Sequence, residues 1–174
     1  MLAYSLGMAR ARFGTQGDAE LRITLDEAAS QAQLALAELR AFARGIHPAI
    51  LTEAGLGPAL QSLAERSPVP ATVGGDVSGR LPAPVEATAY FVVCEALANV
   101  ARHADASAVA IHVARVDGRL VVEVADDGVG GAVAERGSGL RGLADRVLVV
   151  NGRFEVHSPP GGGTRLVAEI PCAC

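Results

Sequence analysis

The sequence predicts an α+β protein. We expect a two-layer α/β sandwich, a mixed and largely antiparallel sheet covered by helices, preceded by a helical hairpin. Two strand–turn–strand patterns, centred on Asp117-Gly118 and on Gly161–Gly163, predict β-hairpins. A long helical pattern follows Pro84, and residues 1–46 show only helical spacing of apolar residues. These observations together predict the fold class.

In residues 1–46 apolar side chains recur at steps of three and four. The clearest stripe runs through Leu25, Ala28, Ala32, Leu36, Leu39, Ala43 and Ile46. A stripe of this spacing is typical of a coiled coil or helical bundle, because it needs a partner helix to bury it. The alternative is an amphipathic hairpin that folds back onto its own domain.

Pro48 is expected to end this first helical region, because proline lacks the N–H that a helix interior needs. A short helix is predicted from Gly55 to Arg66, before a turn at Pro68–Pro70. We therefore divide the chain into a partial hairpin at 1–46, a linker and first domain helix at 47–66, and the main domain at 67–174.

Within the main domain the helical and strand patterns are mixed. The predicted strands are 71–77, 108–115, 119–125, 153–157 and 164–170, and the predicted helices run from Pro84 to about Ala104 and over 140–150. Two of the four connections between consecutive strands are short, which predicts antiparallel pairing of those strands.

The composition excludes several classes of function. Hydrophobic residues make up 50% of the chain and aromatic residues 3%, so the core must be built from aliphatic side chains. The net charge of -4 argues against nucleic acid as a primary partner, because phosphate binding needs a basic surface. No apolar run reaches the roughly 18 residues of a membrane span, and no signal peptide is evident. We expect these residues to be cytoplasmic, whether or not the parent protein is anchored in a membrane.

Glu95, Asn99 and His103 recur every four residues on the predicted helix after Pro84. This spacing aligns a carboxylate, an amide and an imidazole along one helical face. The simpler interpretation is a solvated face, but asparagine is a poor residue in the middle of a helix. Oxygen ligands suit Mg²⁺, which keeps several waters, so Asn99 is its candidate protein ligand. Cys94 is expected to be a small core residue.

Asp126-Asp127-Gly128-Val129-Gly130-Gly131 follows an apolar strand. Aspartate and glycine often build tight turns, which is the simpler explanation. The functional interpretation makes Asp126 a buried acceptor for an exocyclic amine, with glycines that let a flat ring approach the backbone.

Two further glycine motifs occur. Gly137-Ser138-Gly139-Leu140 precedes a predicted helix, where free backbone N–H groups and the helix dipole favour an anion. Gly161-Gly162-Gly163-Thr164 separates two predicted strands, where an ordinary hairpin loop is a sufficient explanation. The spacing matches neither a P-loop nor a dinucleotide-binding fingerprint.

In this order the four motifs resemble the GHKL ATPase superfamily, which includes gyrase, histidine kinases and MutL. The matching positions are Glu95-x-x-x-Asn99 for the N box, Asp126-x-Gly128-x-Gly130 for the G1 box, Gly137-x-Gly139 for the G2 box, and Gly163-Thr164 for the last motif. The runs EALANVARHADAS, DDGVGG, GSGLRGLADRV and GGGTRLVAEIP are similar to the sensor kinases that signal to LuxR-type response regulators. The run ELRAFARGIHPAILTEAGLGPAL resembles the linker after their dimerisation hairpin.

The resemblance implies that ATP lies between the N-box helix and a lid. Asp126 would accept a hydrogen bond from the adenine amine, supported by Thr164, and the G1 glycines Gly128 and Gly130 would border the base. Asn99 would hold Mg²⁺, and His103 would lie near the phosphates. The remaining implied ATP-binding residues are Gly137, Gly139 and Leu140 at the lid.

Glu95 would orient a water on Mg²⁺ or assist proton transfer, because the nucleophile in such kinases is a histidine of another domain. That histidine lies on the first hairpin helix in the family. None of His47, His103, His112 and His157 matches it. We therefore expect a chain that binds ATP but lacks its usual acceptor, with a short lid between Gly131 and Gly137.

Such kinases form homodimers through the hairpin, so we expect dimerisation through residues 1–46, weakened where the first helix is short. The expected partners are ATP and a LuxR-type response regulator. Two alternatives remain at this point. One is an anti-sigma-type serine kinase of the same fold, which normally lacks a hairpin. The other is a non-catalytic nucleotide-binding dimerisation module.

Overall fold

The computed structural model describes residues 49–76, 79–132 and 138–172. All of them belong to the second of two units into which the chain divides, His47–Cys174. The predicted hairpin at 1–46, together with His47, Pro48 and Gly137, lies outside the described residues. Among the described helices, none is both long enough and apolar enough to cross a membrane.

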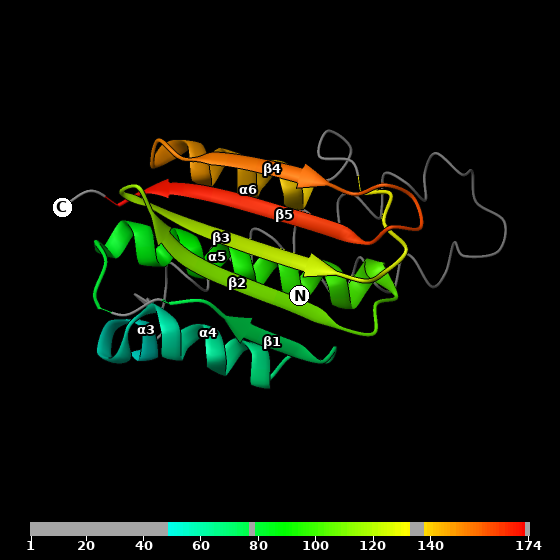
Figure 1. The fold of residues 1–174 in the computed structure, drawn as a ribbon, viewed down its shortest axis with the longest axis horizontal. Helices are drawn as coiled ribbons and strands as arrows, with labels where there is room; N and C mark the ends of the chain where they lie inside the picture. Colours follow the sequence, from blue (N-terminus) through cyan, green and yellow to red (C-terminus); the bar gives the residue numbers. More distant parts are fainter. Residues whose placement is uncertain (1–48, 77–78, 133–137, 173–174) are drawn as a thin grey trace, which may run out of the picture. The chain divides into compact units, whose positions relative to one another are not determined.

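The described elements form one five-stranded mixed sheet with helices. Their order along the chain is α3 (Ala49–Ala54), α4 (Leu56–Glu65), β1 (Ala71–Gly74), α5 (Ala83–Asn99), η1 (Val100–Ala104), β2 (Val109–Val116), β3 (Arg119–Asp126), α6 (Ser138–Val149), β4 (Arg153–His157) and β5 (Thr164–Pro171). The strand order is β1-β2-β3-β5-β4. β1 and β2 are parallel, and the other three pairs are antiparallel. Helices α5 and α6 lie behind the strands in Figure 1, which confirms the predicted α+β sandwich.

The core lies between the sheet and the helices, and it is aliphatic as the composition predicts. The buried helix residues include Ala89, Val93, Ala96 and Leu97 of α5 and Val100 of η1. Alternate strand residues meet them from the sheet, among them Ile111, Val122 and Ala168. The period of two along the strands and the helical period on α5 therefore bury complementary faces.

The turn between β2 and β3 has the geometry that its residues favour. Asp117 and Gly118 both have positive φ angles, 48° and 74°. Two central residues with positive φ match the right-handed twist of a two-residue hairpin, as aspartate followed by glycine favours. This hairpin is confirmed at the predicted place, with Val116 paired to Arg119.

The first strand is shorter than predicted. The sequence suggested a strand over 71–77, but β1 ends at Gly74. Gly75 turns the chain with a φ of 98°, and an added Cβ there would lie 2.0 Å from the carbonyl oxygen of Val113. Extended backbone cannot continue through a left-handed residue packed against the next strand.

The start of α5 is held by a buried carboxylate that the sequence analysis did not single out. Glu86 is 1% exposed. Its Oε1 accepts the Leu81 N–H at 3.0 Å, and its Oε2 pairs with Arg80 at 3.2 Å. Arg80 also donates to the carbonyl oxygen of Thr52 on α3 at 2.8 Å. A buried charge is tolerated only when it is paired and hydrogen-bonded, and here the pair links α5 to α3.

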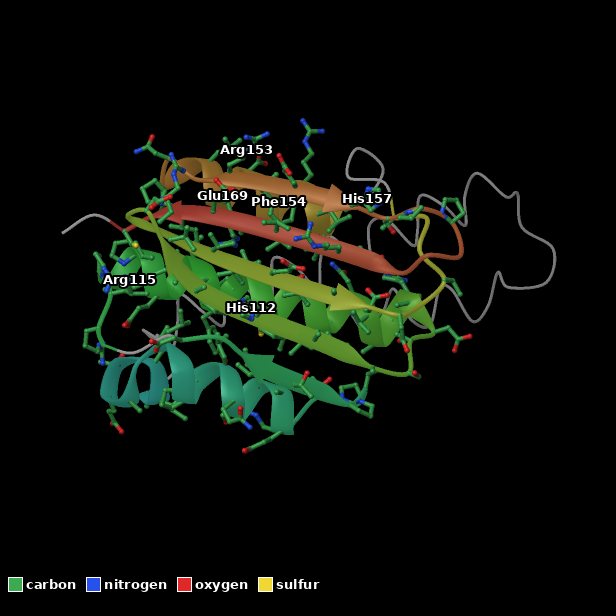
Figure 2. All side chains as sticks on the ribbon, viewed as in Figure 1. His112, Arg115, Arg153, Phe154, His157 and Glu169 are labelled. Carbon is green, nitrogen blue, oxygen red and sulfur yellow. The ribbon has the colours of Figure 1, made fainter. Side chains whose placement is uncertain are left out.

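The sheet face turned away from α5 and α6 carries several charged and polar side chains. The register places His112 opposite Glu123, and Arg153 opposite Glu169, and Figure 2 labels three of these side chains on β2, β4 and β5. Arg165 donates two hydrogen bonds to Glu123, at 2.6 and 2.7 Å, and this interaction lowers the pKa of Glu123. Ion-paired side chains on one face are typical of an antiparallel sheet with a solvated side.

Candidate functional site

The predicted motifs meet at one end of the sheet. The end of η1, the end of β3, the start of α6 and the loop between β4 and β5 lie together there, at the ends where the β3 and β4 arrows point in Figure 1. The Val129 N–H donates to the carbonyl oxygen of Ala104 at 2.8 Å, and the Gly163 N–H donates to that of Gly128 at 2.9 Å. The G1 loop is therefore attached both to the N-box helix and to the last glycine motif.

Asp126 is half-buried at the end of β3, and its carboxylate organises the loop that follows. Its Oδ1 accepts the Gly128 N–H at 2.9 Å and the Thr164 N–H at 3.2 Å. Both bonds use the same oxygen, so Oδ2 is available to accept a hydrogen bond from a ligand. Asp126 and Thr164 are also register partners of β3 and β5. The two residues predicted to recognise the adenine thus lie side by side.

Gly128 is needed because the G1 loop lies directly against the N-box helix. An added Cβ at Gly128 would lie 2.2 Å from the carbonyl oxygen of Ala104. Gly163 has a φ of 69°, and its Cβ would lie 2.1 Å from the carbonyl oxygen of Asp126. A side chain at either position would therefore overlap the backbone of the protein itself. This explains the two glycines independently of the expected approach of a flat ring.

Asn99 is the last residue of α5, and it lies beside the start of α6. A Cβ added at Gly139 would lie 3.7 Å from Asn99 Oδ1. The first N–H groups of a helix have no partner within the helix and favour an anion. An amide oxygen and the N-terminus of α6 are therefore neighbours, as the predicted metal and phosphate site requires.

The remaining predicted residues occupy different environments. Glu95 is half-buried one turn before Asn99, whereas His103 is exposed near the end of η1. η1 is a π-helix, a rare form that is frequent at functional sites, and the sequence pattern did not predict it. Leu140 is 9% exposed and packs in the core. Its role in ATP binding remains a prediction, as does that of Gly137.

Cys94 lies next to Glu95 but is unsuited to act as a nucleophile. Burial raises the pKa of its thiol, and the nearby Glu95 carboxylate raises it further, against the smaller opposing effect of Arg66. The thiolate is the nucleophilic form of cysteine. Cys94 therefore stays protonated and packs partly against the core, as expected for a small apolar residue.

Two residues of this region were missed by the sequence analysis. Asp127 accepts the N–H groups of Ser107 and Ala108, at 2.8 and 3.0 Å, and the Ser107 hydroxyl at 2.5 Å. Ser158 holds the hydroxyl of Thr164, with 2.9 Å between the two oxygens. A second aspartate in the motif and a serine at the end of a strand were the only local signals. Neither signal identifies its partner, which lies elsewhere in the sequence.

Asp127→Asn is expected to lower stability at neutral pH and to flatten its dependence on pH below about pH 4. The hydrogen bonds from Ser107 and Ala108 hold the pKa of Asp127 below its ordinary value of 3.8. The stabilisation is therefore fully present above that ordinary value and is lost as the pH falls through the lower pKa of the folded state. Urea unfolding between pH 7 and pH 3 measures the effect.

The matched control is Asp145→Asn, which neutralises an exposed carboxylate on α6. The stability gap between wild type and Asp127→Asn should narrow as the pH falls, and Asp145→Asn should show no such gap. A gap that stays constant with pH would contradict the assigned hydrogen bonds.

The donors and acceptors of this end of the sheet fit a nucleotide. Asp126 Oδ2 and the Thr164 hydroxyl offer acceptors to an amino group. The start of α6 offers N–H donors to an anion, and Asn99 offers an oxygen of the kind that Mg²⁺ prefers. Within the described ranges no group of three His, Cys, Asp or Glu residues could hold a metal ion. A magnesium ion here would therefore depend on Asn99 and on oxygens of the nucleotide.

Comparison with known proteins agrees with this geometry. Residues 85–173 match the family described as "Histidine kinase-, DNA gyrase B-, and HSP90-like ATPase". The match begins in α5 and includes all of the predicted motifs. It covers about half of the chain.

Curated relatives are sensor kinases. The chain is 34% identical over 150 residues to "Sensor histidine kinase NarS" of Mycobacterium tuberculosis, covering 80% of this chain and 35% of that protein. It is 30% identical over 181 residues to "Sensor histidine kinase MctS" of Rhizobium johnstonii, covering 97% and 38%. The chain thus spans little more than a third of the length of these relatives.

A solved structure has the same fold. The histidine kinase domain of the blue-light activated histidine kinase EL346 from Erythrobacter litoralis matches with a TM-score of 0.60 and 20% identity, covering 98% of this chain and 94% of that one. The order of the motifs, their convergence at one end of the sheet and the match over residues 85–173 lead to one conclusion. The chain belongs to the histidine kinase-, DNA gyrase B- and HSP90-like ATPase family, and its main domain is a catalytic ATPase domain of the histidine kinase type.

Proposed function

We propose that this chain is the ATP-binding catalytic core of a two-component sensor histidine kinase. It binds ATP with Mg²⁺ and transfers the γ-phosphoryl group to a histidine, from which a response regulator of the LuxR type receives it. The observation that carries the proposal is the position of Asn99 beside Gly139, because it combines an oxygen ligand with a helix N-terminus. The names of the relatives, all sensor kinases, support the same activity.

At the base end, Asp126 accepts the exocyclic amine of adenine through Oδ2. Oδ1 is already engaged by the N–H groups of Gly128 and Thr164, which hold the carboxylate in a fixed orientation. An acceptor held in advance loses little conformational freedom when the base binds. The Thr164 hydroxyl supports the amine directly or through a water.

At the phosphate end, Asn99 holds Mg²⁺, and the N-terminal N–H groups of α6 bind phosphate oxygens. A Mg²⁺ ion held there would supply positive charge that stabilises the phosphoryl group during its transfer. Glu95 lies one turn earlier on the same helix, where its carboxylate orients a water of the metal or assists proton removal. His103 is proposed to lie near the phosphates from the end of η1.

The acceptor is proposed to be a histidine of a dimerisation hairpin rather than one of the four histidines in this chain. His112 and His157 are exposed residues of β2 and β4, and Figure 2 labels both. The apolar stripe of residues 1–46 supports a homodimer through the N-terminal helices.

Asn99→Ala is expected to remove most of the benefit that Mg²⁺ gives to ATP binding, by about tenfold in affinity. Titration calorimetry with ATP, in Mg²⁺ and in EDTA, measures this benefit. In EDTA the variant and the wild type should bind alike, because the adenine site is unchanged. Transfer of labelled phosphate to a separately supplied hairpin with an acceptor histidine should fall at least as much.

The control is Asn151→Gly. Asn151 is the only other asparagine in the sequence, and it lies just beyond the far end of α6. Asn151 has a φ of 56°, so glycine keeps its backbone conformation. This variant should behave like wild type in both assays. Equal Mg²⁺ benefits in Asn99→Ala and wild type would refute the metal assignment.

A further inference from the structure

The hydroxyl of Ser158 is the centre of a small hydrogen-bond group behind the candidate base site. Ser158 follows β4 and is half-buried. Its Oγ accepts the Ala132 N–H at 2.9 Å and lies 2.9 Å from Thr164 Oγ1. It also lies 3.4 Å from the carbonyl oxygen of Gly163, to which it donates. Three segments, the G1 loop, the end of β4 and the start of β5, therefore meet at one oxygen.

The protons of this group can be counted. A serine hydroxyl has one proton and two lone pairs. The Ala132 N–H occupies one lone pair, and the Ser158 proton goes to the carbonyl oxygen of Gly163. Either oxygen could donate across the 2.9 Å contact between Ser158 and Thr164. With the Ser158 proton on the carbonyl oxygen of Gly163, Thr164 is the donor in that contact. In this arrangement every donor of the group has a partner within the protein.

The consequence falls on Thr164. When its proton is directed to Ser158, only lone pairs of Oγ1 are left for a ligand. Its backbone N–H is bound to Asp126 Oδ1. Asp126 Oδ2 and Thr164 Oγ1 then offer a ligand only hydrogen-bond acceptors. Two acceptors favour binding of the 6-amino group of a purine, which donates. They disfavour binding of a 6-oxo group, which is itself an acceptor.

We propose that Ser158 is a positioning residue that sets base specificity, by holding the Thr164 hydroxyl as an acceptor and so favouring 6-amino over 6-oxo purine nucleotides. This inference rests on the proposed function, because it requires the base to bind at Asp126 and Thr164. Ser158 need not touch the nucleotide. It acts through the direction of a single proton.

Ser158→Ala is the direct test, because it removes the acceptor that holds the Thr164 proton. That proton becomes free to turn outward and donate to an oxo group. Binding of ATP, inosine triphosphate and purine riboside triphosphate, with Mg²⁺, is measured by calorimetry. ATP affinity should fall roughly fivefold to tenfold, the usual effect of one hydrogen bond. Inosine triphosphate affinity should stay the same or rise. The purine analogue, which has neither group at this position, should change least.

A merely structural role gives a different pattern, in which all three nucleotides lose affinity by the same factor. Ser158→Thr keeps the hydroxyl and should restore the ATP preference. In a Thr164→Val background, where no hydroxyl proton remains to be directed, Ser158→Ala should leave the ratio of ATP to inosine triphosphate affinity unchanged. Thermal unfolding establishes that each variant is folded.

The outcomes separate the two claims. An equal loss for all three nucleotides, or an unchanged ratio in Ser158→Ala, overturns the role of Ser158 and leaves ATP binding intact. Failure of the wild type to bind ATP overturns the proposed function and this inference together. If Ser158→Ala does not fold, the inference is tested with the Thr164→Val variant alone, by its ratio of ATP to inosine triphosphate affinity. A ratio of ATP to inosine triphosphate affinity equal to that of wild type would then refute the inference.

Discussion

Asp126→Asn is expected to weaken the binding of ATP and ADP alike by about 10- to 100-fold. The asparagine oxygen can still accept the N–H groups of Gly128 and Thr164, so the loop keeps its shape. Its NH₂ group then replaces Oδ2 and meets the adenine amine donor to donor. Because the change acts at the base and not at the phosphates, ATP and ADP should lose the same factor in titration calorimetry.

The neighbouring carboxylate provides the matched control for this variant. Asp127 bonds to Ser107 and Ala108 rather than to the base site, so Asp127→Asn should bind nucleotides with wild-type affinity at neutral pH. ATP affinity that is unchanged in Asp126→Asn would show that the base is not recognised by this carboxylate. Loss in both variants would point to distortion of the loop instead.

Gly128→Ala is expected to destabilise the domain by about 2 kcal/mol or more and to weaken nucleotide binding as well. The new methyl group would lie 2.2 Å from the carbonyl oxygen of Ala104 and 2.9 Å from its carbonyl carbon, and this backbone cannot turn aside as a flexible side chain could. To relieve the overlap, the G1 loop must move away from η1. The hydrogen bond from Val129 to Ala104 would be lost in that movement. Urea unfolding measures the loss of stability.

Gly142→Ala is the control, because no atom lies within 4 Å of a Cβ added there. Gly142 is inside α6, where alanine is favoured over glycine by roughly 0.5–1 kcal/mol. The two Gly-to-Ala changes should therefore shift stability in opposite directions. If Gly128→Ala were as stable as wild type, the close contact between the G1 loop and η1 would be wrong.

Most elements of the domain could be predicted from local patterns. The β2–β3 hairpin follows from Asp117-Gly118, and the existence of the helix after Pro84 follows from the spacing of its apolar residues. β1 was predicted too long, because the strand pattern over 71–77 does not report the left-handed turn at Gly75. Helical structure does continue to Ala104 as predicted, but the change of helix type at Val100 was not predicted. Residues Val100–Ala104 have an ordinary helical sequence but form a π-helix.

The candidate site likewise contains residues that the sequence could identify and contacts that it could not. Asn99, Asp126, Gly128 and Thr164 could be selected from the sequence because their motifs occur in a characteristic order. The sequence offered no means of pairing Ser158 with Thr164, or Asp127 with Ser107. The first contact depends on the pairing of β4 with β5, and the second on the pairing of β2 with β3.

The sequence by itself determined what is local and periodic: which faces of α5 and the strands are buried, where the hairpin turns, and which motifs are present. Helical and strand periods are properties of a few consecutive residues. Only the tertiary structure decided why Gly128 must lack a side chain, since its neighbour Ala104 is distant in sequence and close in space. Only it gave Glu86 its partners and Ser158 its place behind Thr164. These contacts arise from packing, because backbones from separate segments approach one another and buried polar atoms need hydrogen-bond partners.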